Sequence, residues 1–241
     1  MIASAMLAIR IAVEVPRTCT HAIDQPRLRV TAAEQQLARQ VIEHVIARAG
    51  GSDDLRRLLL LVAERESSLQ PGIVHRLPAD LAASRAAWRH TRDLYPDNPT
   101  AGVARLWQTY GLFGMNSSYF LRVWDQAADP RVLCDAVIDV LVYRRSLVRM
   151  FRRLVRPVSC GDRLVRVRPT WAALHGAVSG GKLCPGPARD FRRRAARAGL
   201  DPDRVVRLVE LGREPAASVL GEPWSTQYEV LRGLWAEILS E

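Results

Sequence analysis

Apolar residues recur at a helical spacing along most of this chain, and this spacing constrains the fold more than any other feature. Leu55, Leu59, Val62 and Glu66 stand at positions i, i+4, i+7 and i+11, so one face of a single helix holds all four. Alternation of the kind that marks strands is scarce. The sequence therefore predicts a mainly α fold in which Glu66 continues an apolar stripe, while Glu64 and Arg65 point to solvent.

Capping residues predict where the first helices begin and end. Thr31 is followed three residues later by Glu34, which is the pattern of a capping box. The first helix is expected to run to about Ala49, where Gly50-Gly51 stops it. Ser52 is expected to cap the helix that contains Glu66.

Later helices are predicted from the same spacing, and they give a provisional division of the chain. We expect an N-terminal arm over 1–30, a main helical domain over 31–200 with an insertion at about 71–100, and C-terminal helices over 201–241 packed on it. The expected elements are a loop from Gln70 to Thr100 with a short helix at Leu81–Trp88, a long helix from Asp129-Pro130 that breaks near Pro157–Gly161, and helices at Trp171–Ala177, Ala188–Ala198 and around Arg204 and Tyr228.

The charge of the chain favours anionic partners. Lys and Arg total 35 against 25 Asp and Glu, a formal net charge of +10, and Lys182 is the only lysine. Such a field attracts nucleic acid, acidic lipid headgroups and anionic cell-wall polymers. The arginine-rich stretches 144–156 and 189–197 have helical spacing without a recognised nucleic-acid-binding signature, so nucleic-acid binding is not favoured as the main function.

Cysteine and histidine spacing predicts no metal site and no cofactor. No Cys-x-x-Cys pair occurs among Cys19, Cys134, Cys160 and Cys184, and the histidines are scattered. A disulfide is compatible with these cysteines but not required. The first residues, Met1–Val15, are apolar but lack the basic start of a secretory signal, and no run reaches the ~20 apolar residues of a membrane helix.

Glu66 is the candidate catalytic residue. A carboxylic acid that donates a proton near neutral pH needs a raised pKa, and burial against apolar side chains supplies such a shift. The alternative is a solvated glutamate in the last turn of an amphipathic helix.

Two stretches resemble the lysozyme-like superfamily. Glu66-Ser-Ser-Leu-Gln-Pro71 is similar to the stretch that contains the catalytic acid of lytic transglycosylases. Tyr110-Gly-Leu-Phe-Gly-Met-Asn-Ser-Ser-Tyr-Phe120 resembles the Tyr-Gly-Ile-Leu-Gln-Ile-Asn-Ser-x-Trp-Trp stretch of animal-type lysozymes and the Gly-Leu-Met-Gln motif of transglycosylases. The resemblance implies a lysozyme-like domain that cuts peptidoglycan glycan strands.

The resemblance also implies a role for each residue of the second stretch. Gly111 and Gly114 would let the backbone approach a sugar, Asn116 would bind an N-acetyl group, and Tyr119 and Phe120 would stack on sugar rings. The alternative is that Leu112, Phe113 and Met115 belong to the core and the glycines mark a turn. The full set expected to bind substrate is Tyr110, Gly111, Leu112, Phe113, Asn116, Ser117, Tyr119 and Phe120, together with Tyr143 and His175.

Tyr143 and His175 are included because of where they stand in the sequence. His175, in Trp171-Ala-Ala-Leu-His175-Gly176, stands where transglycosylases have an Ala-Tyr-Asn-Ala-Gly stretch, and a buried helical histidine is the alternative. Tyr143, on the preceding long helix, is a second candidate for contact with Glu66.

Departures from the family point to one catalytic carboxylate. Thr109 stands where animal-type lysozymes have their aspartate, and Gly114 replaces the glutamine of the transglycosylase motif. The resemblance then implies a lytic transglycosylase whose glutamate protonates the bond between N-acetylmuramic acid and N-acetylglucosamine, then deprotonates the muramoyl C6 hydroxyl to give a 1,6-anhydro product. The separation from Glu66 to Gly111, 111 − 66 = 45 residues, is long.

Two alternatives stay open at this point. The insertion could return a second carboxylate, from Asp80, Asp93 or Asp97, and make the enzyme a hydrolytic muramidase. The protein could instead be an inactive lysozyme-like structural component of a phage particle. Action in the cell wall or periplasm without an export signal implies delivery by a virion or a secretion machine, with phage tail or secretion-apparatus proteins as partners.

Overall fold

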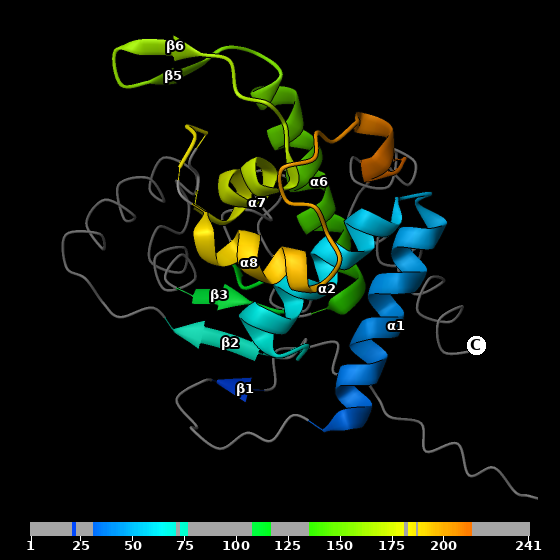
Figure 1. Cartoon of the computed structure of the whole chain (residues 1–241). Coiled ribbons are helices and arrows are strands. Elements are labelled where there is room, and N and C mark those ends of the chain that lie inside the picture. Colours follow the sequence, from blue (N-terminus) through cyan, green and yellow to red (C-terminus); the bar gives the residue numbers. More distant parts are fainter. Residues whose placement is uncertain are drawn as a thin grey trace, which may run out of the picture.

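A computed structural model describes residues 21–22, 31–70, 73–76, 108–116, 135–180, 183–186 and 188–213. Over this part of the chain the fold is mainly α, as the spacing predicts. Figure 1 shows the helices gathered around α6, with the short strands β1 to β3 on one side of them and the hairpin β5–β6 projecting on the other. The elements are β1 (His21–Ala22), α1 (Ala32–Arg48), α2 (Asp53–Ser67), β2 (Ile73–Arg76), β3 (Gln108–Tyr110), β4 (Met115–Asn116), α6 (Ala136–Leu154), β5 (Val158–Cys160), β6 (Arg163–Val165), α7 (Trp171–Gly180), α8 (Arg189–Arg197) and the 3₁₀ helix η1 (Leu208–Leu211).

The predicted ends of α1 and α2 are confirmed. Thr31 accepts the backbone N–H of Glu34, whose carboxylate accepts the backbone N–H of Thr31. Gly50 has a φ of 63°, a value that glycine adopts at little cost and that ends a helix. Ser52 then accepts the backbone N–H of Leu55 and caps α2.

The long basic helix, α6, begins later than predicted. Its first residue is Ala136, because Asp135 has an extended backbone and its carboxylate accepts the backbone N–H groups of Val137 and Ile138. Asp129 to Cys134 lie outside the described residues. The helix ends at Leu154, close to the predicted break.

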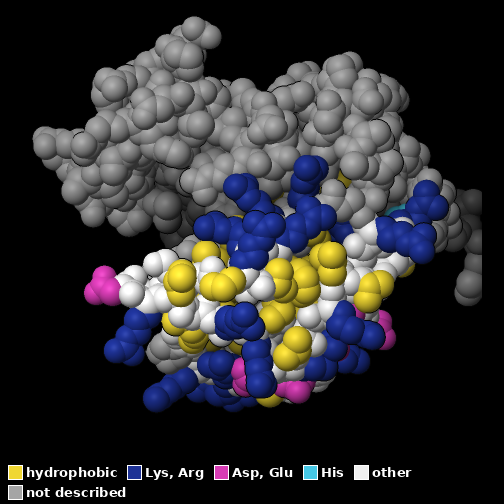
Figure 2. Space-filling model, turned by 90° about the horizontal axis from the view of Figure 1, so that it is seen from above, with side chains coloured by type: hydrophobic (Ala, Val, Ile, Leu, Met, Phe, Trp, Pro, Cys, Tyr) yellow, Lys and Arg dark blue, Asp and Glu magenta, His cyan; other side chains and the backbone are white. Residues whose placement is uncertain are grey.

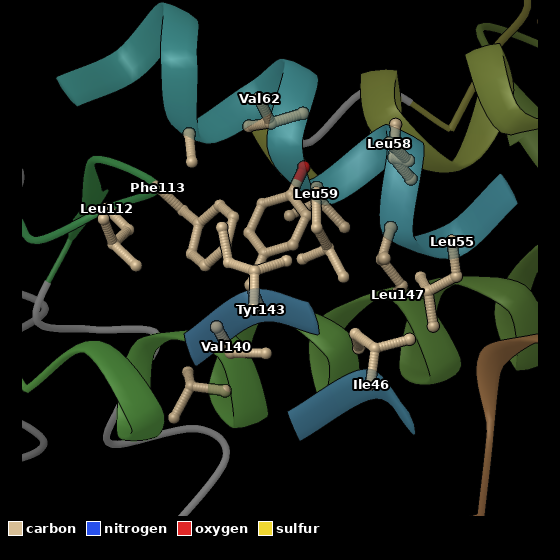
Figure 3. Packing of buried hydrophobic residues seen from close by; sticks show 14 of the residues in the cluster. Ile46, Leu55, Leu58, Leu59, Val62, Leu112, Phe113, Val140, Tyr143 and Leu147 are labelled. Carbon is tan, nitrogen blue, oxygen red and sulfur yellow. The ribbon is translucent and has the colours of Figure 1, made fainter. Parts of the chain in front are cut away.

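One apolar core joins α1, α2, α6, α7, α8 and the turn between β3 and β4. Figure 3 shows part of it, with Phe113 and Tyr143 lying between α2 and α6. Leu211, at the end of η1, is also fully buried in this core. The 3₁₀ helix η1 therefore belongs to the same packed unit as the described helices.

Two regions form short strands that the spacing did not indicate. Residues 73–76, inside the predicted loop, form β2, which joins a four-stranded sheet in the order β1-β2-β3-β4. Residues 158–165 form the antiparallel hairpin β5–β6. Strands of two to four residues are too short to display an alternating pattern, which explains why the spacing did not reveal them. The predicted short helix at Leu81–Trp88 lies outside the described residues.

The C-terminal part of the described chain also differs from the prediction. The helix expected around Arg204 is absent, since Val205 forms an isolated β-bridge with Thr170 and only Leu208–Leu211 is helical. Arg204 reaches across to the carboxylates of Asp54 and Glu210. The helix expected around Tyr228 lies outside the described residues.

A disulfide joins Cys160 at the end of β5 to Cys184, just before α8. The two cysteines are 24 residues apart in the sequence, and the whole of α7 lies between them. The hairpin and the segment that leads into α8 are thereby tied together. Cys19 and Cys134 lie outside the described residues.

The arginine-rich stretch 144–156 does not form one uniform basic face. Arg144 is almost fully buried and donates a hydrogen bond to the backbone carbonyl of Leu211, whereas Arg152 and Arg153 are exposed. Figure 2, seen from above, shows that arginines greatly outnumber acidic side chains on this face of the described part. No helix in that part is both long and apolar enough to cross a membrane.

Candidate active site

Glu66 lies in the last turn of α2, on the same side as the predicted apolar stripe. Leu55, Leu59 and Val62 of that stripe are buried, and the side chain of Glu66 is 34% exposed. Its Oε1 lies 3.6 Å from Nε of the neighbouring Arg65. The carboxyl group therefore stands at the edge of the core, where it is open to a ligand.

The helix ends abruptly just after Glu66. Ser68 and Leu69 both have positive φ values, 53° and 63°, and the backbone N–H groups of these residues bond to the carbonyls of Glu64 and Ala63. This left-handed pair stops α2 and turns the chain toward β2. A backbone of this kind is unusual for residues other than glycine, and such strain often accompanies functional sites.

Ser67 connects the end of α2 to the turn between β3 and β4. Its side chain is buried, and its Oγ lies 2.9 Å from the carbonyl oxygens of both Ala63 and Leu112. A hydroxyl has one proton, so it donates to one of these carbonyls at a time. The contact brings the turn next to the residue that follows Glu66, although 45 residues separate Ser67 from Leu112.

The turn itself is formed by residues 111–114, and Gly111 and Gly114 have φ values of 69° and 57°. The side chains of Leu112 and Phe113 are buried, and the ring of Phe113 stacks on that of Tyr143 at 4.5 Å between centroids, as Figure 3 shows. Both residues are buried as a whole, and the backbone N–H and carbonyl of Leu112 are bonded to Asp139 and Ser67. The core alternative for these side chains is therefore the one that the packing supports.

Asp139 of α6 holds the turn from the other side. Its Oδ2 accepts the backbone N–H of Leu112 at 2.8 Å, and the residue is fully buried. Burial raises the pKa of this carboxyl well above its ordinary value; the hydrogen bond from Leu112 opposes the shift and the charge of Asp135 adds to it. Asp139 was not predicted as a site residue, although an acid within the apolar run Val137–Leu141 is the signal that could have revealed it.

Tyr143 and His175 meet at the other end of the Phe113 ring stack. The Tyr143 hydroxyl lies 3.3 Å from Nδ1 of His175, and the Ser179 hydroxyl lies 3.1 Å from the same nitrogen. The His175 ring in turn stacks on Phe191 of α8 at 4.3 Å. His175 is buried, which agrees with the alternative of a buried helical histidine. The Tyr143 hydroxyl was expected to contact Glu66; within the described chain its hydrogen-bond partner is His175 and not Glu66.

The burial of His175 predicts a loss of stability in acid. Burial, with the nearby charges of Arg65 and Arg194, lowers the pKa of His175 from 6.5 to about 4. The unfolded chain therefore binds this proton more tightly, so the stabilisation present above pH 6.5 is lost as the pH falls toward 4. A shift of this size corresponds to about 3 kcal/mol. Melting curves at pH 7 and pH 4.5 should show a smaller pH effect in His175→Gln than in wild type; equal effects would contradict the assignment.

A pocket of roughly 650 Å³ opens beside this group. Its walls come from α7, from the start of α8, and from the segments 166–170 and 183–186, with Arg65 of α2 at one side. His175 lines this pocket, although the residue is mostly buried. Arg65, expected to be only a solvated charge, links this pocket to Glu66.

Several predicted site residues cannot be placed with these groups. Ser117, Tyr119 and Phe120 lie outside the described residues, as do the candidate second carboxylates Asp80, Asp93 and Asp97. Tyr110 and Asn116 lie in β3 and β4, where Tyr110 pairs with Met115 and Asn116 with Thr109. Within the described ranges, no group of three or more His, Cys, Asp or Glu residues is arranged to hold a metal ion.

The candidate site thus consists of the partly exposed carboxyl group of Glu66, the 111–114 turn held by Ser67 and Asp139, and the arginine-lined pocket. Comparisons of the chain with protein-family models, curated proteins and solved structures found no match. The function must therefore be inferred from Glu66, the turn and the pocket themselves.

Proposed function

We propose that this protein is a lytic transglycosylase that cleaves peptidoglycan between N-acetylmuramic acid and N-acetylglucosamine, with Glu66 as its acid and base. The observation that supports this most is the contact of Ser67 with the Leu112 carbonyl. It joins the end of α2 to the Gly111–Gly114 turn, and these are the two stretches whose sequences resemble the lysozyme-like superfamily. Their proximity is what a sugar cleft of that kind requires.

A single carboxyl group is sufficient for the proposed reaction. Protonated Glu66 would donate its proton to the glycosidic oxygen as the bond to muramoyl C1 breaks, with the N-acetyl group of the substrate stabilising the cation at C1. The Glu66 carboxylate would then remove the proton from the C6 hydroxyl as that oxygen bonds to C1. The product is a 1,6-anhydro sugar, and Glu66 is protonated again at the end of the cycle.

The position of Asp139 excludes this residue as a second catalytic carboxyl group. Two-carboxyl glycosidases need the second group to reach either the sugar or a water molecule. Asp139 is fully buried and its Oδ2 is engaged by the backbone of Leu112, so it is closed to both. It holds the turn in place instead.

The protein would act in the cell wall or periplasm, on glycan strands that are themselves anionic. The exposed arginines seen in Figure 2 would help it adhere to such strands and to other anionic envelope polymers. We propose delivery by a virion or a secretion machine, with components of that machine as protein partners.

A second candidate function is a binding or structural protein on the same scaffold without catalysis. Gly114 favours it, because a φ of 57° suits glycine and the glutamine that transglycosylases have at this point is missing. Such a protein would bind glycan strands through the turn and leave them intact.

Product analysis separates these functions. Purified peptidoglycan is incubated with the protein, and the released muropeptides are identified by mass spectrometry. We expect 1,6-anhydromuramoyl ends, which are lighter by one water than reducing ends. Reducing ends would instead establish hydrolysis, and the absence of soluble fragments over a long digestion would favour the scaffold function.

A further inference from the structure

The pocket beside His175 has an excess of positive charge that its own acids do not neutralise. Five arginines line it: Arg65, Arg166, Arg168, Arg189 and Arg192. The two acidic residues of the pocket already have partners. The carboxylate of Asp203 pairs with Nε and Nη2 of Arg192. The carboxylate of Asp190 pairs with Arg193 and with Arg194, at 2.8 Å each.

Three of the lining arginines have no acidic partner among the described residues. Within the described chain, Arg166, Arg168 and Arg189 form no ion pair, and all three are exposed. A guanidinium presents donors in a planar fork that matches a carboxylate. The three side chains can therefore receive acidic groups without giving up an existing partner.

Apolar residues also line the pocket. Ala173 and Leu183 contribute partly buried apolar surface, Ala172 is buried, and Gly176 leaves open space where a side chain would stand. The volume of roughly 650 Å³ lies in the middle of the range of about 300–1,000 Å³ typical of sites for small organic ligands. A single small anion would leave most of it empty, so the fitting ligand combines acidic groups with short alkyl segments.

The location of the pocket connects it to the proposed chemistry. Arg65 lines the pocket, and its Nε lies 3.6 Å from Oε1 of Glu66. A strand held at Glu66 would therefore place its substituents near the pocket. A short acidic peptide attached to that strand has the carboxylates for the arginines and the methyl groups for the apolar residues that line the pocket.

We propose that this pocket binds the peptide stem of the glycan strand, so that the protein acts on peptide-bearing strands in preference to bare ones. This inference rests on the function proposed above. It adds a second point of recognition, at the pocket that Arg65 lines. Binding there should weaken as salt is added, since the arginines are exposed.

Binding measurements test the proposal without any cleavage. Full-length Glu66→Gln protein is titrated by calorimetry with two soluble probes: a tetrasaccharide of alternating N-acetylglucosamine and N-acetylmuramic acid with tetrapeptide stems, and the same tetrasaccharide with the stems removed. We expect the peptide-bearing probe to bind at least about tenfold more tightly, a difference of about 1.4 kcal/mol. Equal affinities would overturn the proposal.

Charge-neutralising variants test which arginines act. The triple change Arg166→Gln, Arg168→Gln and Arg189→Gln should abolish the preference for the peptide-bearing probe. The matched control changes Arg152, Arg153 and Arg197, which are exposed and do not line the pocket, to glutamine. It removes the same net charge and should keep the preference; loss of the preference in both variants would mean that general attraction, not the pocket, is responsible.

A variant that fills the pocket provides an independent test. A Cβ at Gly176 meets no atom within 4 Å, so Gly176→Phe should fold and occupy the cavity, which its melting temperature would verify. The peptide-bearing probe and the bare probe should then bind with about equal affinity. If the folded variant keeps the preference, or if a soluble glycerol-phosphate oligomer binds wild type more tightly than the peptide-bearing probe does, the proposal fails. Cleavage that depends on Glu66 could still be present, so the two failures are distinguishable.

Discussion

Glu66→Gln should reduce the release of muropeptides from peptidoglycan by about 100-fold or more, because general acid catalysis typically contributes at least this much. Glutamine has nearly the shape of glutamate but neither donates nor accepts the required proton. In the one-carboxylate scheme the same residue serves both steps, so no other group would sustain the reaction. The rate of release is measured by liquid chromatography of the soluble fragments.

A neighbouring glutamate provides the matched control. Glu64 lies on the same turn of α2, with a side chain that is 64% exposed and 3.8 Å from Arg39. Exposed ion pairs contribute little to stability, so Glu64→Gln should retain the wild-type rate within about twofold. If Glu66→Gln kept the wild-type rate while the protein remained active, another residue would have to be the acid.

Gly111→Ala should destabilise the fold by roughly 2–5 kcal/mol, the second large effect that the structure predicts. The φ of 69° costs an alanine about 1–2 kcal/mol. A Cβ at this position would also overlap with Oδ2 of Asp139, so the carboxyl would have to move and release the backbone N–H of Leu112. The melting temperature should fall by roughly 10 °C.

Gly161 separates these two contributions. Its φ of 63° is close to that of Gly111, but a Cβ there meets no atom within 4 Å. Gly161→Ala should therefore cost only the backbone strain, about 1–2 kcal/mol. If both alanine variants lost the same stability, the overlap with Asp139 would not be the cause, and the assigned role of Asp139 in holding the turn would be wrong.

Features that depend on neighbouring residues could be predicted from the sequence. The capping box at Thr31, the N-cap at Ser52 and the stripe that ends at Glu66 follow from hydrogen bonds and spacing within a few residues, and each is present. The start of α6 was placed too early, because Asp135 caps the helix and Ala136 is its first residue. Helix caps and apolar stripes can therefore be predicted without knowledge of the fold.

Features that depend on distant contacts could not be predicted. Nothing near Asp139 in the chain indicates that its carboxyl will meet the backbone of Leu112, because the partner is 27 residues away. The arginines of the pocket come from three separate segments, and their shared excess of charge exists only after folding. The burial of Arg144 within a basic run is a further example, because its partner Leu211 is 67 residues away.

The disulfide between Cys160 and Cys184 has a consequence for how tightly the pocket can hold a ligand. Cys184 belongs to one wall of the pocket, and the bond ties that wall to the β5–β6 hairpin. Opening motions that would separate the two are therefore removed before any ligand arrives. Association then costs the ordering of arginine side chains rather than of a loop, and a binding site prepared in this way retains more of its contact energy as affinity.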